Sequence, residues 1–365
     1  MSTFPAESGK NPTIDVHAHV LIPQLQGLVS NADPDGFDAL QDLEKLRYGA
    51  ESLAVSGVMV KERWPQLTDL DRRLADMDAQ NVDVQLVSPS PSHFYYFANE
   101  KLALEVARQA NVAVRELVDR APTRLNGLGL VPLQHPELMV EALDHAVVEC
   151  GLLGVEIGSF AATPESSERS TVELSDPRLE SFWRRAEELG AVVFLHPFGC
   201  SLDERLDKYY LSNTVSQPAE NAVALSHLIF SGVLDRYPDL KVLAAHGGGY
   251  LPTKLGRSDR AWRVRPDAQK CAQTPSSYLK KLYFDSLVHS AHELQALIAA
   301  AGPEQVLLGS DYPFDMGSDD PVLEVDEANL SPEVRSKVLA NNAARLGIRP
   351  ASATAATPAH ASVAE

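Results

Sequence analysis

Short apolar runs alternate with helical patterns along most of this 365-residue chain. The runs are rich in valine and leucine and show little polar alternation, as expected for parallel strands that are buried on both faces. Eight strands are predicted, at residues 13–16, 82–87, 125–131, 154–157, 191–195, 241–245, 282–284 and 305–308. Because a helical pattern follows nearly every strand, the order predicts an α/β protein with a (β/α)₈ TIM barrel.

Two segments fall outside this repeat. Residues 21–65, approximately, form an insertion after the first strand that is far longer than a usual strand-to-helix loop. We expect this insertion to cover the active site, because long ordered loops are usually functional. Residues 350–365 are rich in Ala, Ser and Thr and lack an apolar period, which predicts a disordered tail. Residues 1–349 are therefore expected to form a single domain.

The composition limits the possible binding partners of the protein and its cellular compartment. The net charge of −18 disfavours nucleic acids and anionic membrane surfaces, which bind proteins through basic faces. No apolar run approaches the roughly 20 residues that span a bilayer, and the N-terminus lacks the features of a signal peptide. The three cysteines are widely spaced, which argues against a disulfide framework. We predict a cytoplasmic protein without nucleic-acid or membrane partners.

Two histidines follow the first predicted strand at alternate positions. Residues i and i+2 of a strand face the same side, so His17 and His19 would emerge together, about 7 Å apart along the strand. That geometry suits one metal ion. A pair of structural histidines would explain the spacing equally well, so the assignment depends on further ligands.

Three more predicted strands stop at residues that bind metals or transfer protons. His196, His246 and Asp311 follow the fifth, sixth and eighth strands, and each has Pro or Gly close behind it. Barrel enzymes carry their chemistry at the carboxyl ends of the strands, and the eighth strand neighbours the first. We therefore predict a metal site formed by His17, His19, His196 and Asp311. Such a ligand set suits Zn²⁺, with Mn²⁺ as the alternative.

A different role is predicted for His246. It precedes three glycines, which permit close approach of the backbone or the substrate, and its strand neighbours that of His196. An imidazole, with an ordinary pKa of about 6.5, is suited to proton transfer. We predict that His246 is an acid/base group beside the metal, with Asp311 as the second catalytic residue. The alternative is a histidine that is hydrogen-bonded in the core.

Several motifs together resemble the amidohydrolase superfamily. They are His17-Ala18-His19, His196-Pro197, His246-Gly247-Gly248-Gly249, Leu255-Gly256-Arg257, Tyr283-Phe284-Asp285-Ser286 and Gly309-Ser310-Asp311-Tyr312-Pro313-Phe314. They are most similar to the branch that contains aminocarboxymuconate semialdehyde, γ-resorcylate and carboxyvanillate decarboxylases. The resemblance runs from about residue 14 to residue 344, and it implies the same metal ligands and the same role for His246. At the fourth strand, Glu156 stands where many two-metal hydrolases of the superfamily have a lysine, which favours a single metal.

The same resemblance suggests cations for the substrate. In similar decarboxylases the arginine of the Leu-Gly-Arg motif reaches the active site of a neighbouring subunit, which implies that Arg257 grips a substrate carboxylate across a homodimer interface. A guanidinium suits this task because it pairs with a carboxylate bidentately. An exposed basic helix face is the alternative. Lys61 and Arg63, in the insertion, are a second pair of candidates for substrate binding. Aromatic residues that either line a pocket or pack in the core are Trp64, Phe94, Tyr95 and Tyr96.

Two kinds of enzyme fit these residues. The first is a non-oxidative decarboxylase, a carbon–carbon lyase, which acts on an aromatic or unsaturated, muconate-like small-molecule carboxylate. The second is a metal-dependent hydrolase of a lactone, an amide or a carbon–carbon bond, or a hydratase, because the same five residues support either chemistry. Residues 255–257 and 309–314 resemble the decarboxylases more closely, so we favour the first. A non-enzymatic metal-binding protein would not need His246 beside the metal.

Overall fold

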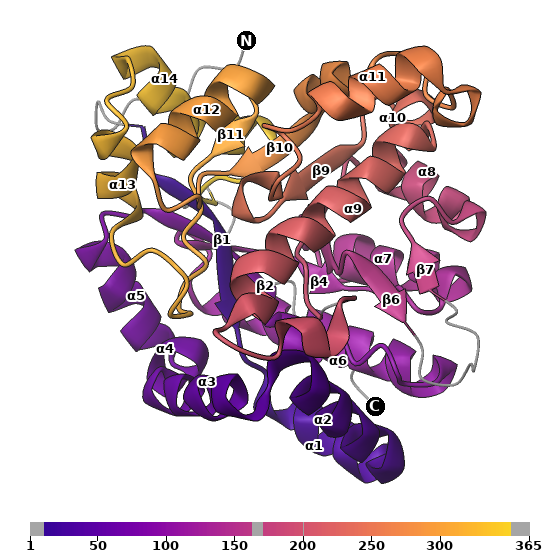
Figure 1. Ribbon diagram of the computed structural model, residues 1–365. Helices are drawn as coiled ribbons and strands as arrows, with labels where there is room; N and C mark the ends of the chain where they lie inside the picture. Colours follow the sequence, from indigo (N-terminus) through magenta and orange to yellow (C-terminus); the bar gives the residue numbers. More distant parts are fainter. Residues whose placement is uncertain (1–10, 163–170, 200, 352–365) are drawn as a thin grey trace, which may run out of the picture.

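The strands form a closed parallel barrel that is surrounded by helices (Figure 1). The computed structural model describes residues 11–162, 171–199 and 201–351, so the predicted tail lies outside the described residues from residue 352 onward. One sheet has the order β1-β2-β3, and a second has the order β11-β10-β9-β8-β5-β4. Val16 N donates to Leu308 O at 2.8 Å and Leu153 N donates to Gly127 O at 2.9 Å, which joins the sheets at both edges. The predicted (β/α)₈ barrel is confirmed.

The strands differ from the predicted ones mainly at their ends. The barrel strands are β1 (Ile14–Val20), β2 (Val84–Pro89), β3 (Leu125–Gly127), β4 (Gly129–Leu130), β5 (Gly154–Ile157), β8 (Val192–Leu195), β9 (Lys241–Ala244), β10 (Leu282–Asp285) and β11 (Val306–Leu307). One predicted strand is divided into β3 and β4 at Leu128. β1 continues to Val20, so His17 and His19 lie inside the strand and not beyond its end. The hairpin of β6 (Phe160–Ala162) and β7 (Thr171–Glu173) is not expected from the sequence.

The helices follow the barrel strands in the order that the sequence predicts, except that the helix at Pro321–Glu327 is not expected from the sequence. They are α5 (Leu70–Ala79), α6 (Glu100–Arg120), α7 (Met139–Asp144), α8 (Glu180–Leu189), α9 (Gln217–Phe230), α10 (Val233–Arg236), α11 (Gly256–Val264), α12 (Ala291–Ala301), α13 (Pro321–Glu327), α14 (Pro332–Ser336) and α15 (Asn342–Arg345). Local signals explain where they begin and end. The Asn99 side chain accepts the Leu102 N–H at the start of α6, and Gly190 takes a left-handed conformation at the end of α8.

The long insertion is helical. It contains α1 (Pro23–Ala32), α2 (Pro34–Tyr48), α3 (Ala50–Glu62) and α4 (Trp64–Thr68). Proline stands in the first turn of α1, α2 and α4, where no intrahelical N–H bond is lost. Gly49 separates α2 from α3 with φ +76°, and a Cβ there would lie 1.8 Å from the Asp207 carbonyl oxygen. A glycine is therefore required at this turn.

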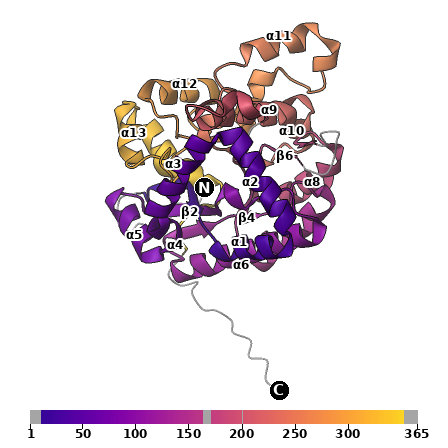
Figure 2. The same ribbon diagram turned by 60° about the horizontal axis from the view of Figure 1, so that its bottom comes forward.

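Hydrogen bonds tie the insertion to the carboxyl end of the barrel. The Tyr48 hydroxyl accepts the Gly199 N–H at 3.0 Å, and Arg63 Nη1 donates to Pro313 O at 3.0 Å. Gly199 belongs to the loop that follows β8, and Pro313 belongs to the loop that follows β11. Figure 2 shows α2 and α3 lying in front of the strands at this end. The insertion thus covers the face at which a barrel enzyme carries its active site.

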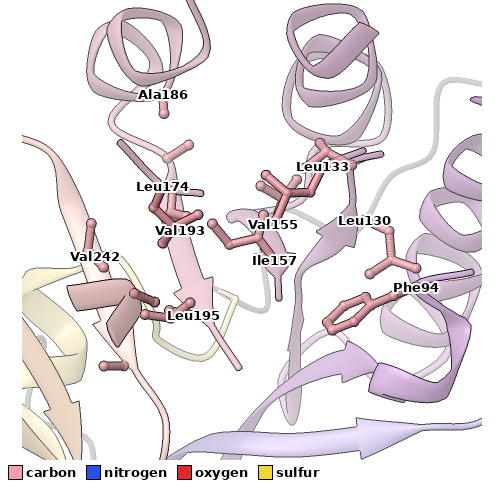
Figure 3. Packing of buried hydrophobic residues seen from close by; sticks show 14 of the residues in the cluster. Phe94, Leu130, Leu133, Val155, Ile157, Leu174, Ala186, Val193, Leu195 and Val242 are labelled. Carbon is pink, nitrogen blue, oxygen red and sulfur yellow. The ribbon is translucent and has the colours of Figure 1, made fainter. Parts of the chain in front are cut away.

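Apolar side chains fill both faces of the barrel wall. Leu128, Phe194 and Leu243 belong to an inner cluster that plugs the barrel. Val155 and Val193 belong to the larger cluster between strands and helices, part of which is drawn in Figure 3. This two-sided burial explains why the strands lack polar alternation. No helix within the described ranges is both long enough and apolar enough to cross a membrane.

Candidate metal centre

A bulge in β1 directs both of its histidines to the barrel interior. The pairing of β1 with β2 shifts between Asp15 and Ala18, where one extra residue stands on β1. Within the bulge Val16 packs in the inner apolar cluster and the next side chain, His17, is fully buried, as is His19 beyond the bulge. A bulge re-aims side chains and is common beside active sites. Because of the bulge, the apolar first half of β1 leads to a polar site at its carboxyl end.

His17, His19, His196 and Asp311 form a four-residue cluster, in which one ligand atom from each side chain lies within 4.8 Å of the others. The Nε2 atoms of His17 and His19 are 3.0 Å apart. Asp311 Oδ1 lies 3.3 Å from His17 Nε2 and 3.1 Å from His19 Nε2. The predicted ligand set therefore comes together, from β1 and the loops after β8 and β11.

In the three imidazoles, the Nδ1 atoms lie on the opposite side of the ring from Nε2, and they are hydrogen-bonded to the protein. His17 Nδ1 lies 2.6 Å from Asp285 Oδ2, and His196 Nδ1 lies 3.0 Å from Pro197 O. Both partners only accept, so the Nδ1 atoms carry the protons. His19 Nδ1 lies 3.2 Å from Ser88 Oγ. The Nε2 lone pairs of His17 and His196 consequently face the cluster, and His196 Nε2 has no hydrogen-bond partner. Bare nitrogens that converge beside a carboxylate fit a divalent cation.

The electrostatics of the cluster support this fit. Burial lowers the pKa of His19 to about 4 and holds that of His196 well below its usual value. Burial acts on His17 in the same direction, but the Asp311 and Asp285 carboxylates outweigh it and raise the His17 pKa to about 10. Burial opposes ionisation of Asp311 as well, yet the neighbouring histidines hold its pKa well below the usual range. The cluster thus combines an ionised carboxylate with two imidazoles whose pKa is lowered, and the raised pKa of His17 shows that positive charge is favoured beside the carboxylates.

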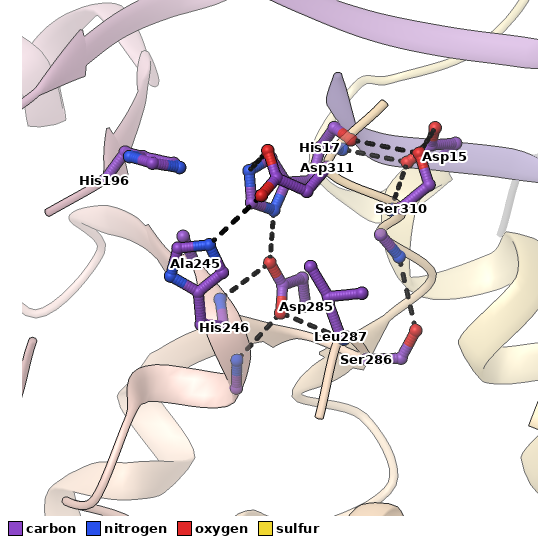
Figure 4. A network of polar contacts seen from close by, with 12 residues as sticks. Asp15, His17, His196, Ala245, His246, Asp285, Ser286, Leu287, Ser310 and Asp311 are labelled. Carbon is purple, nitrogen blue, oxygen red and sulfur yellow. Dashed lines mark hydrogen bonds and ion pairs between the residues drawn. The ribbon is translucent and has the colours of Figure 1, made fainter. Parts of the chain in front are cut away.

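Asp285 connects the cluster to the turn after β9. Its carboxylate accepts from His17 Nδ1, from His246 N at 2.9 Å and from Gly247 N at 2.8 Å (Figure 4). The side chain is fully buried at the end of β10. Asp285 therefore fixes the tautomer and orientation of His17 and also the position of the His246 backbone. From the sequence, Asp285 is named only as part of the motif at residues 283–286 and no role is predicted for it, although it directly follows a predicted strand.

We expect the substitution Asp285→Asn to weaken metal binding by about 10–100-fold, the usual effect of losing an outer partner of a metal ligand. An amide has only one acceptor oxygen, so it cannot serve His17 and both backbone N–H groups. Titration of the apoprotein with Mn²⁺ or Zn²⁺ measures the change. Asp267→Asn, at an exposed carboxylate, is the control. Unchanged metal affinity in Asp285→Asn would contradict the expectation that Asp285 supports metal binding through its hydrogen bond to His17.

A left-handed turn presents His246 to the cluster. His246 and the three glycines after it all have positive φ, from +54° to +74°. A Cβ at position 249 would lie 2.2 Å from the Pro218 carbonyl oxygen, so glycine is required there. His246 Nε2 lies 3.5 Å from Asp311 Oδ2, and 17 % of its side chain is exposed. His246 thus stands beside the cluster and outside its ligand set, as its predicted acid/base role requires.

A second buried network holds β1 against β11. Asp15 accepts from Ser310 Oγ at 2.6 Å and from Gln85 Nε2 at 3.0 Å. Gln85 in turn accepts from Arg73 Nη1 at 2.7 Å, and Arg73 Nη2 donates to the His19 carbonyl. These side chains are fully or almost fully buried. The network fixes the strands that carry His19 and Asp311, and the sequence pattern alone does not identify it.

Glu156 is fully buried on β5 but does not join the four-residue cluster. Neither of its carboxylate oxygens has a hydrogen-bond partner, and burial raises its pKa well above the usual range. Burial in this environment favours the protonated form of the carboxyl group over the charged form.

The predicted substrate-binding cations lie in two places. Arg257 is exposed on α11, a helix without a buried residue, and so it does not reach the cluster of its own chain. Lys61 is exposed in the last turn of α3. Arg63 binds the Pro313 carbonyl and lies 3.7 Å from Asp319 Oδ1, beside the loop that carries Asp311. The structure thus gives Arg63 a structural contact, and the substrate roles of all three residues stay predictions.

The aromatic residues divide into two groups. Phe94, Tyr95 and Tyr96 line a cavity of about 370 Å³ between α2 and the loops after β2, β5 and β8. Trp64 lies elsewhere, with 44 % of its surface exposed. Arg47, which the sequence analysis does not consider, also lines the cavity. The polar sequence of α2 does not indicate that Arg47 lines a cavity, because only the packing of α2 against the barrel brings Arg47 to this position.

Comparison with known proteins finds relatives of this chain that are named decarboxylases. The chain is 33 % identical to 2-amino-3-carboxymuconate-6-semialdehyde decarboxylase of Dictyostelium discoideum, over 83 % of this chain and 82 % of that protein. It is 28 % identical to gamma-resorcylate decarboxylase of Rhodococcus jostii, over 80 % of this chain and 92 % of that protein.

A solved structure has the same fold. Dihydroxybenzoic acid decarboxylase of Polaromonas sp. JS666, with bound manganese and the inhibitor 2-nitroresorcinol, superposes with a TM-score of 0.74. The sequences are 24 % identical, and the match covers 92 % of this chain and 97 % of that one. Residues 14–346 match the sequence pattern that defines the amidohydrolases, a span that includes every residue of the cluster. The chain therefore belongs to the amidohydrolase family.

Proposed function

We propose that this protein is a metal-dependent, non-oxidative decarboxylase of an aromatic or unsaturated, muconate-like carboxylic acid. The observation that carries the proposal is the convergence of His17, His19, His196 and Asp311, with His246 beside them, at the covered end of the barrel. The relatives support it, because two are named decarboxylases of such acids. A hydrolase or hydratase is the alternative, since the same side chains could serve it.

We propose a single divalent ion at the cluster. Zinc suits three imidazoles and a carboxylate, and manganese, which the Polaromonas structure contains, is the alternative. Glu156 supports one ion, because it lies outside the set of converging ligand atoms. A cytoplasmic location stays a prediction from the composition.

In this function the residues of the chain orient the acid and deliver a proton. When bound, the ion would supply Lewis acidity toward the substrate carboxylate. Asp285 holds the His17 ring and the His246 backbone in fixed positions. His246 would carry a proton on its ring and give it to the substrate carbon as CO₂ departs. The electron pair of the broken carbon–carbon bond stays on that carbon and forms the new C–H bond.

Metal analysis and product analysis test the proposed reaction. Purified protein would be loaded with Zn²⁺ or Mn²⁺ and supplied with hydroxybenzoates, aminobenzoates and muconate semialdehydes. We expect CO₂ and the decarboxylated product in equal amounts from at least one class. Release of a ring-opened or hydrated product without CO₂ would instead establish the hydrolase or hydratase alternative.

We also propose that Arg257 binds a substrate carboxylate in the active site of a second copy, within a homodimer. The exposure of Arg257 on a helix without buried residues supports this, because such a helix is available for contact with a partner. Arg257→Ala should raise KM strongly. Arg257→Lys should restore it only in part, because an ammonium cannot form the bidentate pair of a guanidinium.

Subunit mixing tests the shared site. A mixture of the impaired Arg257→Ala and His246→Asn chains should be more active than either variant alone, since a hybrid dimer has one site with both residues intact. Exchange would be verified with two differently tagged chains. Verified exchange without recovered activity, or an active dilute monomer, would refute the shared site.

A further inference from the structure

An aromatic cavity lies beside the metal centre and has no part in the chemistry described above. Its volume of about 370 Å³ falls in the range of roughly 300–1,000 Å³ that is usual for ligand pockets. Its walls come from α2 and from the loops after β2, β5 and β8. The described aromatic residues that line it are Tyr48, Phe94, Tyr95, Tyr96, Phe97, Phe160 and Phe198.

One loop of the cavity follows β8, as the metal ligand His196 does, and the other two follow β2 and β5, which pair with β1 and β8. Phe198 lies two residues beyond His196 in the sequence. The Tyr96 hydroxyl accepts the Gly158 N–H at 2.8 Å, directly after β5. Ser88, at the end of β2, lies 3.2 Å from His19 Nδ1. The cavity is therefore at the same end of the barrel as the four-residue cluster and next to it around the rim.

The walls of the cavity are held in place before a ligand arrives. The Phe94 and Tyr96 rings are stacked, with centroids 5.1 Å apart and an interplanar angle of 5°. The Tyr48 and Tyr96 hydroxyls both accept backbone N–H groups from the opposite wall. Tyr95 has φ +40°, a strained conformation that the surrounding packing maintains. Fixed aromatic faces suit a planar ligand, because little side-chain entropy is lost on binding.

We propose that this cavity binds the distal planar apolar part of an extended aryl or dienyl carboxylate, whose reacting carboxylate lies at the metal centre. The proposal rests on the function proposed above, which places that carboxylate. A planar apolar group would stack on the aromatic walls. Glu44 and Arg47 are the charged residues among the described lining of the cavity, and both belong to α2. A polar substituent at the far end of the ligand would lie against them.

Two matched substitutions on α2 test the cavity. Leu43 lines it, whereas Leu46 is on the same helix, does not line it and is 48 % exposed. Leu43→Trp should fill the cavity, and Leu46→Trp adds the same side chain outside it. The probes are 2-hydroxybenzoate and 4-phenyl-2-hydroxybenzoate, titrated calorimetrically into metal-loaded protein. We expect the unchanged protein to bind the phenyl compound at least tenfold more tightly than the single ring.

Leu43→Trp should abolish that tenfold preference and keep the affinity for 2-hydroxybenzoate, while Leu46→Trp should retain both. Ala39→Phe, which also points at the cavity from α2, replaces Leu43→Trp if the latter does not fold. Equal affinity for both probes, or equal behaviour of Leu43→Trp and Leu46→Trp, would overturn the proposal. CO₂ release is measured separately. A phenyl preference that responds to Leu43→Trp, without CO₂ release from any of the three substrate classes named above, upholds the cavity site and rejects the decarboxylase.

Discussion

His196→Ala should lose bound divalent metal and decarboxylase activity together. The His196 Nε2 atom is buried, has no hydrogen-bond partner and faces the other three members of the cluster. Its removal takes away one of four converging ligand atoms. The loss of metal affinity should therefore exceed the roughly 10–100-fold loss that is typical for outer partners. Metal content by elemental analysis and turnover at saturating metal are the measurements.

A histidine outside the site gives the control for this experiment. His292 is exposed on α12, so His292→Ala should keep both the metal and the activity. His17→Ala, His19→Ala and Asp311→Ala should behave as His196→Ala does. If purified His196→Ala kept its full metal content and full turnover, the assignment of the cluster would be wrong.

His246→Asn should retain the metal but reduce kcat by about 10²–10⁴-fold, the usual contribution of a positioned acid/base group. Asparagine is a suitable replacement, because His246 has φ +54° and asparagine tolerates this left-handed region well. A loss of activity in this variant then reports the missing imidazole and not a rearranged turn. Metal content, kcat and KM are measured on the same preparation.

Two results would reassign His246. Loss of the metal from His246→Asn would make His246 a metal ligand, although it lies outside the four-residue cluster. Its Nε2 atom is 3.5 Å from Asp311 Oδ2. Full kcat with full metal would remove it from the proton transfer. Asp285→Asn changes the support of both residues at once, because it alters the hydrogen bond to His17 and the hold on the His246 backbone without removing either ring.

The barrel could be predicted because its signals are local. Valine- and leucine-rich runs mark strands that are buried on both faces, and the helical periods between them are independent of the tertiary contacts. The same locality located His196, His246 and Asp311, since each directly follows a strand and the carboxyl ends of barrel strands meet. Strand ends were less accurate. β1 extends to Val20 because its pairing with β2 and with the loop after β11 continues past the histidines.

The sequence by itself thus determined the order of the strands and which side chains meet at their ends. Only the tertiary structure decided how these side chains are held. The bulge in β1, the three contacts of Asp285 and the link from Asp15 through Gln85 to Arg73 depend on residues that come from different elements of the chain. The packing of α2 likewise decided that Arg47 and the aromatic loop residues enclose one cavity. The reason is physical: periodicity reports which face of an element is buried, whereas a polar partner is chosen only when the barrel closes.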